Sequence, residues 1–220
     1  MSTSQRGAAH DAGPIRGTPP SRAAGGWGWA FVVLLLVSAG MASVPGGADA
    51  TSTVRDFYTR HTSVIVVAQL IGLVAAAAFV PFTFALRRGS ADRRARPDVE
   101  AAGCAVAVAA LLTAVPVLWL TAVAGTGSTG YVHALAVASD LTDVALFSAI
   151  ALWAATLVRA ATPAWFRALA GIVAVLTLLR ALLIIARSSA LEVVAPTSFV
   201  VLVAVVSTAA LVRRPVVVAR

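Results

Sequence analysis

The sequence predicts an all-α, polytopic membrane protein, a bundle of six transmembrane helices with both termini in the cytoplasm. Of its 220 residues, 60% are hydrophobic and 12% are charged, whereas soluble domains have about 45–50% and about 25%. The hydrophobic residues form six long runs, and a helix of roughly 20 apolar residues crosses the hydrocarbon core of a bilayer. The basic residues that give the net charge of +8 lie in short clusters between these runs. That distribution marks cytoplasmic loops and excludes a nucleic-acid-binding face.

The elements follow from the N-terminus in a simple order. Residues 1–26 are rich in Gly, Pro, Ser, Ala and Arg and offer almost nothing to bury, so we expect a disordered cytoplasmic tail. A short basic cytoplasmic tail closes the chain at 213–220. Between the tails we expect six spans, at residues 27–44, 64–86, 101–124, 132–158, 168–186 and 193–212.

The arginines predict the orientation. With the first tail inside, 13 of the 17 basic residues fall in inside segments, whereas Arg55, Arg60 and Arg187 fall outside and Arg180 falls within 168–186. The positive-inside rule therefore places both termini in the cytoplasm. All 17 basic residues are arginine, which indicates a high-GC bacterial genome and hence the bacterial plasma membrane.

The first run has a second interpretation. A basic tail, a short apolar core and the residues GADA ending at Ala50 resemble a signal peptide, and Ala42 is another possible cleavage point. Cleavage would leave five spans and the same later topology. The sequence leaves both interpretations open.

The segment before the second run predicts an extra helical turn outside the membrane. Thr53 and Asp56 have the spacing of a capping box, so the second helix is expected to begin near Thr53. Val54, Tyr58 and His61 would then lie along one side of it.

Two aspartates in the fourth run form the candidate polar site. Asp140 and Asp143 are three residues apart and share a helix face, and Arg180 and Arg187 in the fifth run are seven apart. A short turn near Pro163 joins these two spans, so we expect them to be antiparallel neighbours. Charged groups in a bilayer need partners or protonation, because each costs roughly 2.5–3.5 kcal/mol at the centre of a span.

Depth along the two helices suggests how the charges pair. Asp143 and Arg180 lie 20 and 17 residues from the turn, which is a difference of about 4–5 Å at about 1.5 Å per residue. Asp140 and Arg187 differ by about 1.5 Å on the same rise. The sequence therefore predicts a two-rung ladder, Asp143–Arg180 and Asp140–Arg187, with Gln69 completing the hydrogen bonds.

This polar cluster supports two functions. As structural glue it would fix the register of the helices in an accessory or scaffold-like protein. As a working site it would bind a proton or a small polar ligand in a small transporter or sensor, which is the default hypothesis for ionisable residues within a membrane. The sequence favours the structural interpretation, because the acids and the arginines can neutralise each other. The transporter or sensor is the alternative, and the sequence identifies no ligand.

Catalytic motifs are lacking or out of context. Gly125, Gly127 and Gly130 spell G-x-G-x-x-G, but they join two spans instead of a strand and a helix. Asp140-x-x-Asp143 has the spacing of the magnesium-pyrophosphate pairs of membrane prenyltransferases, yet their second set of aspartates is absent. We therefore expect a non-enzymatic protein with no cofactor.

The remaining reactive residues predict no metal centre. His61 and His133 could join Asp140 on the outer side, but solvated histidines at the membrane interface are the favoured interpretation. Cys104 is the single cysteine, which excludes an internal disulfide. The expected partner is the lipid bilayer, and stripes of small residues allow a homo-oligomer or a membrane-protein partner.

Three stretches carry a resemblance to a known group. They are FYTRH…Q leading into 64–86, SDLTDVALF within 132–158, and the arginine midway along 168–186. With these the chain resembles uncharacterised six-span membrane proteins of actinobacteria, grouped as a domain of unknown function. The resemblance covers residues 27–212 and implies a helical bundle in the plasma membrane, with no known activity and no functional residue to carry over.

Overall fold

The computed structural model describes residues 22–41, 44–89, 96–160 and 163–212, and all the regular structure in these segments is helical. Six of the described helices are long and apolar enough to cross a membrane, which confirms the predicted all-α fold with six membrane-spanning helices. A short helix, α2, precedes the second span. The helices are α1 Arg22–Met41, α2 Thr51–Arg60, α3 Thr62–Gly89, α4 Arg96–Val123, α5 Thr129–Ala160, α6 Ala164–Ile185 and α7 Val194–Val212.

Two predicted boundaries need correction. Helix α1 begins at Arg22, so residues 22–26 belong to it and not to the tail; residues 1–21 and 213–220 lie outside the described residues. Helix α2 begins one residue after Ala50, whose side chain makes no capping hydrogen bond, so the capping box at Thr53 is wrong. The helix is interrupted at His61, and α3 begins at the next residue.

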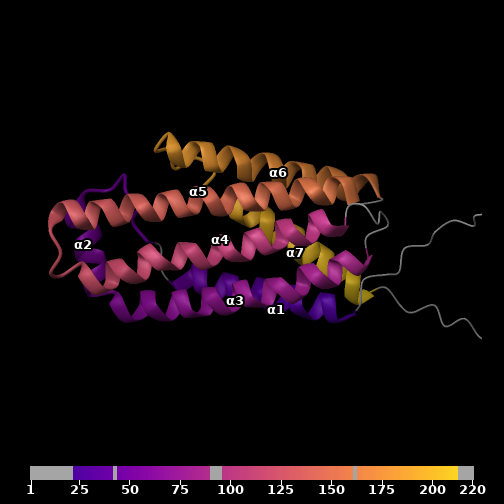
Figure 1. Cartoon of the computed structure of the whole chain (residues 1–220), viewed down its shortest axis with the longest axis horizontal. Helices are drawn as coiled ribbons and strands as arrows, with labels where there is room; N and C mark the ends of the chain where they lie inside the picture. The colour runs from indigo at the N-terminus through magenta and orange to yellow at the C-terminus, as the bar shows by residue number, and fades with distance from the viewer. Residues whose placement is uncertain (1–21, 42–43, 90–95, 161–162, 213–220) are drawn as a thin grey trace, which may run out of the picture.

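The six long helices form a closed ring. Each packs on its neighbours in the order α1, α3, α4, α5, α6, α7, and α7 returns to α1. The start of α1 and the end of α7 lie together at one end of the bundle, which we call the terminal end (Figure 1). Helix α2 lies at the opposite end, the α2 end, where it packs on α3, α4 and α5.

Helix α1 is an integral part of this ring. Its Phe31 is buried, with its ring centroid 4.8 Å from that of Phe79 and 5.8 Å from that of Phe199. Cleavage after Ala42 or Ala50 would remove this helix and open the ring between α3 and α7. Whether the chain is cleaved there stays a prediction.

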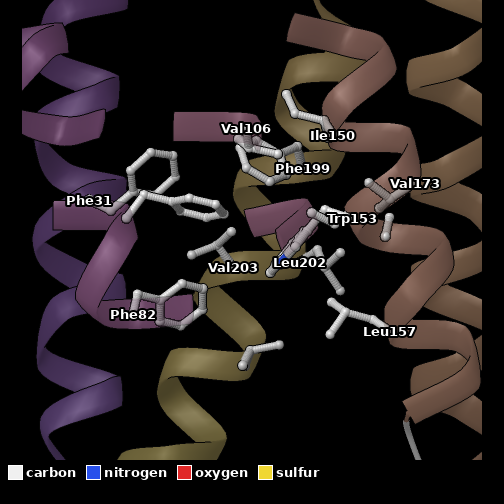
Figure 2. Packing of buried hydrophobic residues seen from close by; sticks show 14 of the residues in the cluster. Phe31, Phe82, Val106, Ile150, Trp153, Leu157, Val173, Phe199, Leu202 and Val203 are labelled. Carbon is white, nitrogen blue, oxygen red and sulfur yellow. The ribbon is translucent and has the colours of Figure 1, made fainter. Parts of the chain in front are cut away.

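Most of the bulky interior lies in one apolar cluster, the terminal-end cluster, in the half of the bundle nearer the terminal end. Trp153 of α5 is fully buried in it, with Phe79, Phe199 and Phe82 at ring-centroid distances of 5.3, 5.9 and 6.3 Å. Figure 2 shows Trp153 reaching from α5 towards Leu202. The buried members are Phe31, Val32, Ala75, Ala78, Phe79, Phe82, Val99, Ala102, Val106, Ile150, Trp153, Ala154, Leu157, Ala160, Ala170, Val173, Phe199, Leu202, Val203 and Val206.

A second, smaller cluster fills the other end of the bundle. This α2-end cluster is built by α2, α3, α4 and α5, together with Ala124 just beyond the end of α4. Its buried members are Val54, Tyr58, Ile65, Val117, Leu120, Ala124, Val132 and Ala136. Helices α1, α6 and α7 contribute none of these residues, so the α2-end cluster has no complete ring of six around it.

Candidate functional site

Between the two apolar clusters the helices of the bundle carry polar side chains. On α5 the buried apolar face runs from Val132 to Ala136 and resumes at Ile150. The interval holds Asp140 and Asp143. The equivalent intervals on the other helices each contain a polar side chain. At this level the polar residues are Ser38 of α1, Gln69 of α3, Thr113 of α4, Asp140, Thr142 and Asp143 of α5, Thr177 and Arg180 of α6, and Ser198 of α7.

These residues form a layer, because they lie at similar depths. Ser38, Asp143 and Arg180 stand 16, 17 and 16 residues from the terminal ends of their helices. At about 1.5 Å per residue this places all three about 24–26 Å from the terminal end. We call this set the polar layer. The other members stand between 13 residues (Thr177) and 20 residues (Gln69) from the terminal ends of their helices, so the layer is about 10 Å thick.

The lengths of the helices place the polar layer near one margin of the membrane. Helix α6 has 22 residues and is therefore about 33 Å long, just enough for a hydrocarbon core of about 30 Å. Helix α5 has 32 residues and extends beyond α6 at the α2 end (Figure 1). If α6 spans the core, Asp143 lies close to the margin on the α2 side, where a carboxylate costs less than at the centre.

Asp143 faces the inside of the ring. It lies seven residues after Ala136 and seven before Ile150, both of them buried, and residues at this spacing share a helix face. Its side chain is half-buried. Within the described residues Asp143 accepts no hydrogen bond and forms no ion pair, since the two ion pairs there join Arg60 to Asp56 and Arg87 to Glu100.

Asp140 has a different environment. Its Oδ2 accepts a hydrogen bond of 2.9 Å from the backbone N–H of Gly47, in the connection between α1 and α2. The connection packs so closely there that a Cβ on Gly47 would lie 2.8 Å from the same oxygen and 3.0 Å from Val137. Gly46 approaches Asp140 as well. Asp140 therefore ties the connection to α5 and plays a structural part.

Tyr58 brings a third polar group to this region from α2. The residue has 0% exposure, and its hydroxyl has no hydrogen-bond partner in the described part of the chain. Burial raises the pKa of the Tyr58 phenol far above its ordinary value, and the carboxylates of Asp143 and Asp140 raise it further. The phenol therefore stays neutral, within electrostatic range of both acids.

Arg180 does not form the predicted ladder. Its Nη1 donates to the carbonyl oxygens of Ser188 at 2.7 Å and Ala190 at 3.3 Å, in the connection between α6 and α7. Its Nε is buried and has no partner among the described residues. Arg180 acts electrostatically on both aspartates, but it approaches neither within 4.0 Å, so the predicted Asp143–Arg180 rung is wrong.

The second rung fails for a related reason. Helix α6 ends at Ile185, and Arg187 has φ 55°, a left-handed conformation. The seven-residue spacing from Arg180 therefore does not keep Arg187 on the same face. Arg187 is exposed and forms no ion pair with Asp140, whose oxygen is engaged by Gly47. The turn also brings the Ser188 carbonyl back to Arg180, which supplies the acceptor that the aspartate was expected to provide.

The other predicted contributors are spread around the site. Gln69 is half-buried on α3 at the level of the polar layer, and within the described residues it makes no hydrogen bond to either aspartate. His61 caps the end of α2 with its ring 4.9 Å from that of Phe57, and His133 is exposed on α5. No group of three His, Cys, Asp or Glu residues that could hold a metal ion is present in the part of the chain that the structure describes.

Comparison of the chain with protein-family models, with curated proteins and with solved structures finds no match. The resemblance to actinobacterial six-span proteins therefore stays a prediction, and the site has to be interpreted from its own geometry.

The sequence did not identify Tyr58 and Gly47 as parts of the site. Both belong to the segment between the first two spans, and they reach α5 through contacts that no local pattern encodes. One signal was present: Tyr58 lies on the same side of α2 as Val54, at i and i+4, and both are buried. A polar aromatic on the buried side of a short helix indicates a partner beneath it.

Proposed function

We propose that this chain is a non-enzymatic, multi-pass protein of the bacterial plasma membrane, a small transporter or sensor. Its working site would be the polar layer around Asp143, which takes up a proton or a small polar ligand. The observation that supports this proposal is the carboxylate of Asp143, which faces the inside of the ring at the margin of the membrane and has no ion-pair partner among the described residues. An ionisable group there without a fixed partner is available to bind something else.

The function that the sequence favoured was an accessory or scaffold-like protein held together by the Asp–Arg ladder. That function depended on mutual neutralisation of the four charged residues. Among the described residues Arg180 is held by carbonyls and Asp143 has no ion-pair partner, so the ladder no longer supports that function. Asp140 does act as structural glue, but it binds a backbone amide of the α1–α2 connection.

The compartment that supplies the ligand follows from the arginines. The positive-inside rule puts the terminal end in the cytoplasm, which turns the α2 end outward. Asp143 is nearer to the α2 end of α5 than to the terminal end, its side chain is half-buried, and α2 packs on α5 at that end. We therefore propose that the site exchanges with the outer compartment. Lipid contacts the exposed apolar faces, and a homo-oligomer or a membrane-protein partner stays a prediction.

The test compares Asp143→Asn, Arg180→Gln and the double variant with the parent chain, in purified full-length protein and in cells. If Asp143 is a working residue, Asp143→Asn should fold with unchanged or higher thermal stability, since it removes an unpaired charge and no ion pair. A strain carrying it should nevertheless match a deletion strain. Asp56→Asn is the matched control, because Asp56 is an exposed aspartate of α2.

Dicyclohexylcarbodiimide gives an independent readout. This apolar reagent couples to protonated carboxyl groups in membrane surroundings, and the coupled residue is identified by mass spectrometry. We expect coupling at Asp143 and none at Asp56. The proposal fails if Asp143→Asn cannot fold and the added Arg180→Gln restores the fold, because that pattern is the signature of a structural charge pair.

A further inference from the structure

Two opposite charges of the polar layer lie within electrostatic range of each other without forming an ion pair. Asp143 and Arg180 stand at matching depths on neighbouring antiparallel helices, and each lies within electrostatic range of the other. Their charged atoms are nevertheless more than 4.0 Å apart, the limit of an ion pair. In a medium of low dielectric such a pair attracts strongly. A stable gap between the two needs either a rearrangement or something that fills it.

The unused hydrogen-bonding groups on the two sides are complementary. The carboxylate of Asp143 offers only acceptors, and none of them is engaged within the described residues. On Arg180 the Nη1 group is held by the carbonyls of Ser188 and Ala190, whereas the buried Nε has no partner. The free edge of the guanidinium therefore contains Nε and Nη2, whose parallel N–H groups match the two oxygens of a carboxylate.

Tyr58 supplies a separate indication of a ligand. Its hydroxyl is fully buried, has no partner in the described chain, and lies within electrostatic range of Asp143 and Asp140. A buried hydroxyl without a hydrogen bond costs about 1–3 kcal/mol. A ligand beside Asp143 that offers a donor and an acceptor would remove that cost. Helices α2, α5 and α6 thus each carry one unsatisfied polar group among the described residues, and those of α2 and α6 both lie within electrostatic range of Asp143.

We infer that the ligand of the site is a small zwitterion, with an ammonium group at Asp143 and a carboxylate at the Nε–Nη2 edge of Arg180, and that Tyr58 hydrogen-bonds to it. This inference rests on the proposed function and deepens it by naming the ligand class. A small amino acid has both groups on one short chain. It is neutral overall, so both charges of the site become paired at the same time.

Other ligand classes fit the same groups less well. A bare metal ion takes about six oxygen ligands, but the described residues hold no group of three metal-binding side chains. Helices α3 and α5 also run through the polar layer without interruption, so their carbonyls there are used in helical hydrogen bonds. In α4, Pro116 has no N–H to donate, which frees the single carbonyl of Leu112. An amine alone would leave Arg180 unsatisfied, and an anion alone would leave Asp143 unpaired.

The decisive experiment uses an amino acid and its two halves. β-Alanine, ethylammonium and propionate are titrated into the purified full-length protein at constant ionic strength, with binding heat and thermal midpoint as readouts. Glycine and γ-aminobutyrate serve as a shorter and a longer zwitterion. We expect at least one zwitterion to bind and to raise the midpoint with the logarithm of its concentration, as a ligand of the native state does. Neither half-molecule, nor an equimolar mixture of the two, should reproduce the effect.

Variants locate the binding. Asp143→Asn and Arg180→Gln should each weaken the zwitterion by about tenfold or more, which is the range for hydrogen bonds to charged groups. Tyr58→Phe should weaken it by about 2–10-fold, because one neutral hydrogen bond is lost. Arg187→Gln is the matched control, since Arg187 is an exposed arginine beyond the end of α6 and its loss should leave the affinity unchanged.

The outcomes separate this inference from the proposed function. If ethylammonium alone binds as tightly as every zwitterion, or if none of the three zwitterions binds, the inference is wrong. The proposed function survives that result when Asp143→Asn folds, loses its phenotype and no longer couples to the carbodiimide. If Asp143→Asn fails to fold and Arg180→Gln rescues it, both fail together.

Discussion

The two halves of α5 differ in what they contact. The half from Ile150 to Ala160 contributes Trp153 and Leu157 to the terminal-end cluster, and its buried face there is mostly apolar. The half from Val132 to Asp143 packs under α2 and ends in the carboxylates of the polar layer. One half builds a core, and the other brings ionisable groups to the margin of the membrane. The bundle therefore places the residues that stabilise the fold and the residues that can bind a ligand on different halves of a single helix.

Removing the largest side chain of the terminal-end cluster is the most severe test of whether that half of α5 stabilises the fold. Trp153→Ala should lower the free energy of unfolding by about 3–5 kcal/mol, because it leaves a cavity among Phe79, Phe82 and Phe199. Denaturant titration in mixed micelles measures the loss. Trp165→Ala is the control, since Trp165 is 58% exposed and its loss should cost about 1 kcal/mol or less.

If Trp165→Ala were as costly as Trp153→Ala, the stability would not be concentrated in the terminal-end cluster. If Trp153→Ala instead abolished binding at Asp143 while leaving the unfolding free energy unchanged, the two halves of α5 would have exchanged roles. Either result would overturn the division of the helix.

A second test concerns how closely α1 approaches the ring. A Cβ added at Gly28 would meet the hydroxyl of Ser207 and two ring carbons of Phe82 at 2.8 and 2.9 Å. Gly28→Ala should therefore cost about 1–3 kcal/mol by overpacking. Gly26 of the same helix has nothing within 4 Å of such a Cβ, so Gly26→Ala should be neutral or gain up to about 1 kcal/mol of helix propensity.

Equal effects of the two alanines would contradict the packing of α1 on α7. The comparison also bears on the first span, because a chain that had lost α1 would respond to neither substitution. Thermal unfolding of the full chain in detergent is sufficient to distinguish these cases.

The membrane spans could be predicted from the sequence because they depend on composition along a single helix. Each of the six runs overlaps one long helix, and the arithmetic that gave Asp143 and Arg180 similar depths holds in the structure. Depth needs only the rise per residue and the position of the turn. The depth of the polar layer could therefore be predicted from the sequence.

The pairing of the charges could not be predicted in the same way. Whether Arg180 meets Asp143 depends on the path of the α6–α7 connection, where Arg187 and Leu191 adopt left-handed conformations. A carbonyl of that connection replaced the expected carboxylate. Tyr58 was missed because α2 reaches α5 across more than eighty residues of sequence, and such contacts leave no local pattern.

The last test concerns the contact between α2 and the polar layer, and the change it should produce is small. In a Tyr131→Phe background Tyr58 is the only remaining tyrosine, so its ionisation can be followed by absorbance at alkaline pH. Because burial and the two carboxylates raise the pKa of Tyr58, tyrosinate should form only well above the ordinary value of 10.0. Asp143→Asn should lower that pKa towards 10.0 without reaching it, since burial is the larger cause.

The same shift has a consequence for stability. Above pH 10.0 unfolded chains lose the Tyr58 proton while folded chains keep it, so the free energy of unfolding should fall as the pH rises further. Tyr58→Phe should remove this alkaline loss, because phenylalanine has no proton to lose. An Asp143→Asn variant whose tyrosine titrates as in the parent would place the carboxylate away from α2. In that case the α2-end cluster would be a second, independent core, and the ligand site would have to be sought between α5 and α6 alone.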